Sequence, residues 1–140
     1  MRSIVEIEAA QAKLIAVQTG AVTMPDEFYD PTNNYKLECM AKEMARILTL
    51  APGETVENRR AGVDKLLDRM LAASLGTQAS LIAYHGGAEE VWLPKWCVNL
   101  TAMVNVLDWA LGNPDGEAIA ENLSAIDAYS AIGNDNEREA

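Results

Sequence analysis

The sequence predicts an all-α protein: a single compact bundle of five or six helices around a central helical hairpin. Three observations support this prediction. Apolar residues recur at helical spacing, turn residues separate the helical segments, and 140 residues suit one domain. A domain of this length should bury roughly two-thirds of the surface of its unfolded chain, enough for a core without disulfides. We therefore assign residues 1–133 to one helical domain and residues 134–140 to an acidic polar tail.

The predicted hairpin spans residues 33–76, with its two arms at residues 35–50 and 56–75. Apolar residues recur at three- and four-residue steps along both arms, so one face of each arm should be buried. Pro52 cannot continue the first arm, and Gly53 relaxes the turn that follows. The two arms should therefore fold back on each other as neighbours, with the rest of the chain packed around them.

A first helix is predicted from Ser3 to about Thr19. Ser3 fits its N-cap, Glu6 completes a capping box three residues later, and Gly20 fits its end. Its larger apolar residues should share one face and its alanines should form a smooth flank: Ile4, Ile7, Leu14 and Val17 on the face, and Ala9, Ala12 and Ala16 on the flank. Residues 24–34 contain several Pro, Asp and Asn turn signals and should form a loop.

The later segments are predicted from the same signals. Gly76 should end the second hairpin arm in a left-handed conformation. Residues 77–84 form a short apolar run that could be a brief helix or a strand, and helix is favoured because the neighbouring segments are helices. The next helix should end at the turn of residues 112–116. The last helix should run over residues 117–132, with Gly133 at its end.

The charge of the chain limits what it can bind. The net charge is −10; residues 113–140 alone carry −6, whereas the hairpin carries +1 and seven of the eleven Lys and Arg residues. A strongly acidic protein is not expected to bind nucleic acid directly. No apolar run approaches the length of a membrane span, and acids within the first apolar segment argue against a signal peptide. We expect a cytoplasmic protein, located in the host cytoplasm if the chain is viral.

No residue pattern specifies an enzymatic activity, a cofactor or a metal site. A nucleophilic pair would need Cys39 or Cys97 activated by the only histidine, His85. A Gly-Gly turn separates His85 from Cys97, and no third orienting group is indicated. One His and two distant Cys cannot supply a standard zinc site. We interpret both cysteines as small buried hydrophobes in a reducing cytoplasm, with a single disulfide between them as the alternative.

One alternative is a magnesium-dependent all-α nucleotide hydrolase. Such pyrophosphohydrolases hold magnesium with paired acids on two successive helices, and Glu54 with Glu57 and Asp64 with Asp68 superficially resemble those pairs. Both pairs would belong to one helical arm, however, and basic residues such as Lys65 lie close by. Ordinary surface ion pairs therefore explain the pattern, and we expect a protein that is not an enzyme.

The basic residues of the hairpin are candidate ligand-binding residues. Lys42 and Arg46 stand four residues apart, so they stack on one side of the first arm. Glu38 and Glu43 are close enough along the helix to neutralise part of this charge. That proximity favours a solvated face over a binding site.

The hairpin also resembles the hairpin of phage-encoded cyclic-oligonucleotide sponges. The resemblance rests on Tyr35, the run Ala41-Lys42-Glu43-Met44-Ala45, Pro52, Glu57, Ala61 and the pair Lys65-Leu66. Those proteins sequester the signalling nucleotides of bacterial defence as helical oligomers, so the resemblance implies that Tyr35 and Lys42 contact a small nucleotide. This alternative site comprises Tyr35, Lys42 and Arg46. The resemblance covers about a third of the chain, the second arm lacks a tryptophan found in the family, and the region after Gly76 has no counterpart there.

Three tryptophans fall within eighteen residues and indicate a possible partner surface. Trp96 lies on an apolar helical face and should belong to the core, while Trp109 lies one position off that face and should sit at its edge. Trp92 stands in an irregular segment beside two acids and should be exposed. An exposed Trp followed by Leu93 and a proline is typical of an anchor for a protein partner, with packing inside the domain as the alternative.

We expect the partner surface to combine this segment with the acidic last helix. Its residues are Trp92, Leu93, Trp96, Glu117, Glu121 and Asp127. The expected function is non-catalytic and consists of protein binding or self-association. Such a function suits a small viral or mobile-element protein that is an assembly component or an inhibitor of a host factor. In an inhibitor, the acids of the last helix could imitate the phosphates of nucleic acid.

Overall fold

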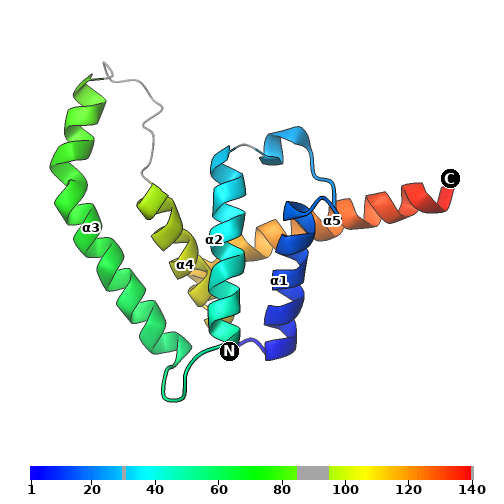
Figure 1. The fold of residues 1–140 in the computed structure, drawn as a ribbon, viewed down its shortest axis with the longest axis horizontal. Coiled ribbons are helices and arrows are strands. Elements are labelled where there is room, and N and C mark those ends of the chain that lie inside the picture. The colour runs from blue at the N-terminus through cyan, green and yellow to red at the C-terminus, as the bar shows by residue number, and fades with distance from the viewer. Residues whose placement is uncertain (30, 85–94, 140) are drawn as a thin grey trace.

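The computed structural model describes residues 1–29, 31–84 and 95–139, with side chains described for 1–29, 33–73 and 95–130. In chain order the elements are α1 (Ile4–Gln18), the 3-10 turn η1 (Asp26–Tyr29), α2 (Pro31–Leu48), α3 (Val56–Tyr84), α4 (Lys95–Leu111), the 3-10 turn η2 (Pro114–Gly116) and α5 (Glu117–Glu139). Figure 1 shows their arrangement. The described residues contain no strand, and the five helices pack together, which confirms the predicted all-α class.

The N-terminal capping box forms as predicted. Ser3 Oγ accepts a hydrogen bond from the backbone N–H of Glu6, and the Glu6 carboxylate accepts one from the backbone N–H of Ser3. These bonds satisfy N–H groups that the first turn of a helix leaves without a partner. The bond from Ser3, together with Arg2, lowers the pKa of the Glu6 carboxyl. At the other end of α1, Gly20 has a φ of +82°, a left-handed conformation that favours glycine.

The centre of the bundle is α4 rather than the predicted hairpin. Its buried side chains come from nearly every side of the helix: Leu100, Ala102, Met103, Val106, Leu107, Asp108, Trp109 and Ala110. Such a helix must be covered all round, and α2, α3 and α5 all pack against it. The two hairpin arms run in opposite directions, but α3 packs mainly on α4, and α2 packs on α1 and α4 (Figure 1). The arms are therefore not the close neighbours that the turn at Pro52 and Gly53 suggested.

α2 begins earlier than predicted, at Pro31, inside the segment 24–34 that was expected to be a loop. Proline fits the first turn of a helix because its missing N–H has no helical partner there. The preceding turn η1 is tied to α2 by Asn34, whose side-chain N–H donates to the carbonyl of Tyr29 (3.0 Å). The Tyr29 hydroxyl in turn accepts a hydrogen bond from the backbone N–H of Met24 (2.9 Å).

Two glycines that were expected to end helices lie inside them instead. α3 continues through Gly76 and includes residues 77–84, so this run is helical, as favoured, but is part of a longer helix. α5 continues through Gly133 into the segment 134–140 that was expected to be a tail. A glycine in a helix interior costs only about 1 kcal/mol relative to alanine, so it ends a helix only where other signals agree.

Trp109 is buried, which corrects its predicted position at the edge of an apolar face. The Arg2 guanidinium lies over its ring, with 4.7 Å between Cζ and the ring centroid, and Arg2 Nε donates to its carbonyl (2.9 Å). Gly116, from η2, packs directly against the Trp109 backbone. Trp96 is partly buried against the core, in agreement with the prediction from its helical face. The N-terminus and the turn after α4 thus cover Trp109 from two sides.

Two glycines should respond in opposite ways to substitution by alanine. A Cβ at Gly116 would lie 2.3 Å from both N and Cα of Trp109, so Gly116→Ala forces backbone movement and should destabilise the protein by about 3 kcal/mol. A Cβ at Gly62, within α3, would meet nothing within 4 Å. Gly62→Ala should therefore stabilise the protein by roughly 0.5–1 kcal/mol. Urea unfolding followed by circular dichroism measures both changes, and equal shifts of the same sign would contradict this packing.

Candidate functional site

Two buried carboxylates fix the position of α3. Glu43 on α2 and Asp108 on α4 are each 1% exposed. Both oxygens of Glu43 accept hydrogen bonds from Arg59, one from Nε and one from Nη2 at 2.8 Å. Asp108 Oδ1 accepts hydrogen bonds from Arg60 Nε at 2.7 Å and from the side chain of Asn113 at 2.9 Å. Neighbouring arginines of α3 thus connect this helix to two different helices.

These hydrogen bonds also stabilise the charged form of the two arginines. The hydrogen bond to Glu43 raises the pKa of the Arg59 guanidinium above its usual value, and the hydrogen bond to Asp108 does the same for Arg60. A buried carboxylate without such a partner would be strongly destabilising. Neither pair was predicted from the sequence as a structural contact. One signal was present: Asp108 is the only charged residue between Trp96 and Leu111.

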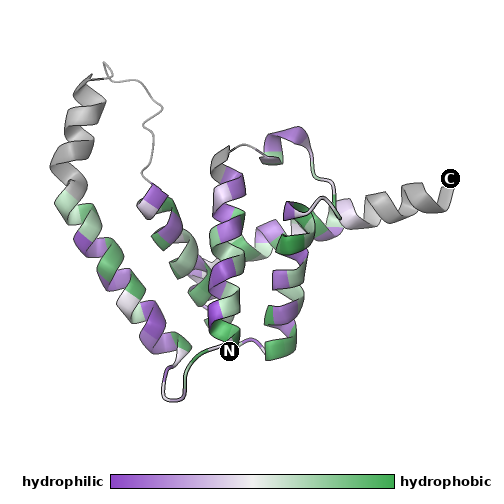
Figure 2. Ribbon diagram, in the orientation of Figure 1, coloured by the Kyte–Doolittle hydropathy of each residue, from purple (hydrophilic) through white to green (hydrophobic). Residues whose placement is uncertain are grey.

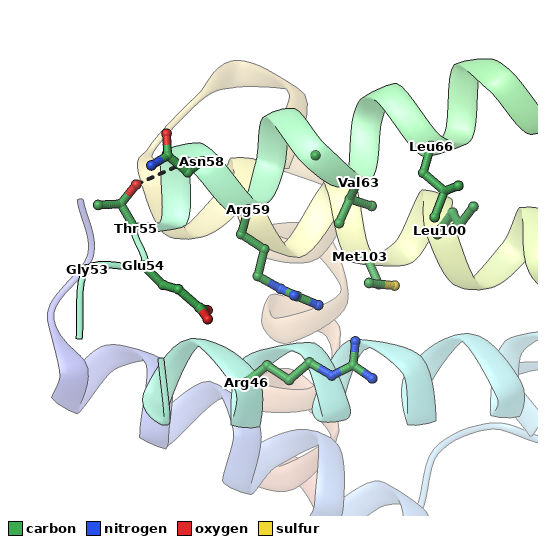
Figure 3. Close-up of a pocket in the computed structure, with 11 residues that line it drawn as sticks. Arg46, Gly53, Glu54, Thr55, Asn58, Arg59, Val63, Leu66, Leu100 and Met103 are labelled. Carbon is green, nitrogen blue, oxygen red and sulfur yellow. Dashed lines mark hydrogen bonds between the residues drawn. The ribbon is translucent and has the colours of Figure 1, made fainter. Parts of the chain in front are cut away.

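A cleft of about 590 Å³ opens between α2 and α3, with α4 as its floor (Figure 3). Its apolar side is formed by two residues of α3 and two of α4, and its polar side by the turn before α3, the start of α3 and one arginine of α2. The lining residues are Arg46, Gly53, Glu54, Thr55, Asn58, Arg59, Gly62, Val63, Leu66, Leu100 and Met103. The cleft exists because α3 packs on α4 and reaches α2 through the Arg59–Glu43 pair.

Arg46 supplies the most accessible positive charge in this cleft. Its side chain is 58% exposed, and its Nη1 lies 3.7 Å from Oε1 of Glu43, whose oxygens already accept two hydrogen bonds from Arg59. Among the described residues Arg46 makes no side-chain hydrogen bond. Glu54 also points into the cleft from the turn before α3 (Figure 3). The site thus offers a cation with free donors beside an apolar wall, together with one opposing acid.

Of the three residues predicted to bind a nucleotide, Arg46 alone lines the cleft. Lys42 Nζ is paired with Glu38 at 2.8 Å, and this hydrogen bond raises the Lys42 pKa. Lys95 Nζ lies 5.6 Å from the centroid of the Tyr35 ring, and partial burial raises the Tyr35 pKa. The structure therefore places Tyr35, Lys42 and Arg46 along α2, and of these three described residues only Arg46 contributes to this cleft.

The predicted partner surface near the tryptophans is described only in part. Trp92 and Leu93 lie outside the described residues, so their role as an anchor stays a prediction. Trp96, in the first turn of α4, is partly buried against the core. Its ring therefore contributes to packing as well as to any surface at this end of α4.

The acids predicted on the last helix are exposed, but they do not form one continuous row. Glu117 and Glu121 lie one turn apart at the start of α5, whereas Asp127 lies six residues further, roughly 120° around the helix. Asp127 is also paired with Lys13 of α1, with 3.0 Å between Oδ1 and Nζ. This ion pair joins α5 to α1 and partly neutralises the charge that was predicted to face a partner.

A second candidate surface is the solvent side of α1, which the sequence did not reveal. Among the side chains that the structure describes, six large apolar ones are exposed, and four of these belong to α1 or precede it: Met1, Ile4, Val5 and Ile15. Ala9 and Ala12 are exposed between them, as are the acids Glu6 and Glu8. We call Ile4, Val5, Ala9, Ala12 and Ile15 the α1 outer face. Figure 2 shows the hydrophobic N-terminal end of this helix.

The α1 outer face lies opposite the side that packs into the bundle. The buried residues of α1 are Ile7, Ala10, Leu14 and Val17. Our prediction that Ile4 shares their face is therefore wrong, because Ile4 is 64% exposed. A surface helix normally presents polar residues to water, and a helix that is apolar on both sides is typical of one with a second partner.

Other predicted chemistry can be placed in the same structure. Cys39 and Cys97 are both free thiols, so they do not form the alternative disulfide, and burial raises the pKa of the Cys39 thiol. The described residues contain no group of three or more His, Cys, Asp or Glu side chains suited to a metal ion. Asp64, predicted as a possible magnesium ligand, has its Oδ2 atom 3.8 Å from Nη1 of Arg60.

Within the described part of the chain, no helix is both long and apolar enough to cross a membrane.

The fold and these surfaces define the class as an all-α protein of five packed helices. Comparison of the chain with protein-family models, with curated proteins and with solved structures gives no match.

The Arg59–Glu43 pair should contribute far more to stability than an exposed pair on the same helix. Arg59→Met leaves the Glu43 carboxylate buried beside Arg46 alone, so unfolding free energy should fall by about 3 kcal/mol. Lys42→Met, which breaks the exposed pair with Glu38, should leave stability nearly unchanged. Chemical denaturation of the two variants measures the difference.

A double substitution separates the effect of the two charges on stability from the effect of side-chain shape. Glu43→Leu combined with Arg59→Met removes both charged groups and should recover much of the stability lost in Arg59→Met. Similar losses for Arg59→Met and Lys42→Met would show that this pair does not hold α3 in place.

Proposed function

We propose that this protein is a non-catalytic assembly protein that associates with a second copy of itself through the α1 outer face. The observation that carries the proposal is the exposure of Ile4, Val5 and Ile15, which are 64%, 73% and 43% exposed on one helix. Burial of an aliphatic side chain is worth about 1.5–3 kcal/mol, so these residues favour association wherever a complementary surface is present.

The shape of the α1 outer face suits an antiparallel copy of the same helix. Ile4 and Val5 lie at one end and Ile15 at the other, with Ala9, Ala12 and the exposed acid Glu8 between them. Small residues at the centre allow two helix backbones to approach closely, and a two-fold axis there brings Ile4 near the partner's Ile15. The same patch then serves both copies, as a two-fold symmetric interface requires.

The size of this face predicts weak association. α1 has 15 residues and is therefore about 22 Å long. One side of such a helix offers roughly 400 Å² per chain, about half of the 800 Å² that each partner buries in a standard stable interface. We expect a reversible dimer that forms at micromolar concentrations or higher and dissociates on dilution.

Sedimentation velocity over a dilution series tests this function. The wild-type protein should shift from dimer to monomer as concentration falls, and Val5→Lys should be monomeric throughout because it places a charge in the contact. The matched control is Ala61→Lys, which adds the same charge at an exposed alanine of α3 and should dimerise normally. A wild-type protein that remains monomeric at every concentration would contradict the proposal.

A second variant distinguishes this surface from the predicted tryptophan anchor. Trp92→Ala should leave both the dimer and the melting temperature unchanged if association uses α1. If Trp92→Ala dissociates the dimer and Val5→Lys does not, the assembly surface lies at Trp92, Leu93 and Trp96 instead. A loss of dimer in both variants with a normal Ala61→Lys would indicate that the interface extends over both regions.

A further inference from the structure

We propose that the cleft between α2, α3 and α4 binds a small amphipathic organic anion, with its charged group on Arg46 and its apolar body against Leu66, Leu100 and Met103. This site is separate from the α1 outer face and does not depend on the proposed self-association. The class of ligand follows from the shape of the cleft, the residues on its apolar wall and the charges at its opening.

The shape and the apolar wall favour a compact apolar body. The cleft holds about 590 Å³, within the roughly 300–1,000 Å³ typical of small-molecule sites. Leu66 is 47% exposed although Leu100 and Met103 beside it are buried, so an occupant would cover an apolar side chain that α4 leaves uncovered (Figure 3). Gly62 keeps this wall open, because a side chain built there would meet no protein atom within 4 Å.

The accessible guanidinium of Arg46 favours an anion. Glu43 is hydrogen-bonded to Arg59 through both oxygens, and Arg46 stands 3.7 Å away as an additional cation, so these three side chains together carry one positive charge. Arg46 keeps its guanidinium donors available to a carboxylate, sulfonate or phosphate group. Glu54 at the opening opposes this charge, and it should therefore weaken the binding of an anion.

The lining residues also favour an amphipathic anion over a nucleotide. Tyr35 and Lys42 do not line the cleft, and none of the residues that line it is aromatic, so a base would find no ring on which to stack. An aliphatic or small aromatic body with one acidic group matches the leucine and methionine wall better.

Two matched dyes test the site. 8-Anilinonaphthalene-1-sulfonate is an amphipathic anion, and N-phenyl-1-naphthylamine has the same aromatic body without the sulfonate. Fluorescence titration should show the sulfonate dye binding one site per chain, more tightly than the neutral dye. Arg46→Gln should weaken the sulfonate dye about tenfold and leave the neutral dye unchanged, because it removes only the charge-assisted contact.

Further variants define where the dye binds. Gly62→Leu should fill the cleft and abolish binding of both dyes, and leucine is a better helix former than glycine, so the fold should be retained. Leu66→Gln provides a second test on an exposed residue and should weaken both dyes. Glu54→Gln should tighten the sulfonate dye alone. Val5→Lys, on the α1 outer face, should change neither dye.

The outcomes are distinguishable. Full binding in Gly62→Leu, with a native near-ultraviolet circular dichroism spectrum, would overturn the site. Equal affinities for the two dyes, unchanged in Arg46→Gln, would overturn the anion assignment. If Val5→Lys abolished binding, the dye would be reporting on the α1 outer face and not on the cleft.

Discussion

The buried carboxylate of Asp108 is the constraint on which the arrangement of the helices depends. It lies in the last turn of α4, the helix that the others cover, where an uncompensated charge would be strongly unfavourable. Compensation comes from outside α4: Arg60 is on α3, and Asn113 is in the turn that leads to α5. α3 must therefore meet α4 in one register, and the next residue back along α3, Arg59, is then placed to reach Glu43 on α2. The two buried acids, Asp108 and Glu43, thus fix the relation of three helices.

This arrangement explains why the cleft is open. In a closed hairpin, α2 and α3 would bury apolar side chains against each other. Here α2 directs its buried residues, among them Met40 and Met44, into a core shared with α1 and α4, and the contact from α3 to α2 is an ion pair. A guanidinium and a carboxylate need directional hydrogen bonds, so they separate two helices more than interdigitating leucines would. The apolar floor and the polar opening of the cleft therefore both result from the way in which these two arginines hold α3.

Local sequence patterns predicted the helices well because periodicity and capping are local properties. The capping box of Ser3 and Glu6 and the stop at Gly20 follow from residues within a few positions of each other. Gly76 and Gly133 failed as stops because one glycine in a helix interior adds only a small penalty, and both helices continue past these positions. The pairing of Asp108 with Arg60 joins residues 48 positions apart, so no local period encodes it. For α1 the difficulty was different: apolar residues surround the helix, and periodicity cannot choose which of two apolar sides faces the core.

The two candidate surfaces, the α1 outer face and the cleft, belong to different helices. In Figure 1 α1 lies on one side of α2, and α3 and α4 lie on the other. The cleft is lined by residues of α2, α3 and α4 and by none of α1. α2 is held between them by buried side chains on its α1 and α4 sides, so a contact made on the α1 outer face does not need to move Arg46 or Glu43. Two interactions couple only when they bias a shared element between two arrangements, and the structure shows α2 in one arrangement, packed between α1 and α4. Occupation of the cleft and association through α1 should therefore be energetically independent, and a dimer built on α1 would carry two open clefts.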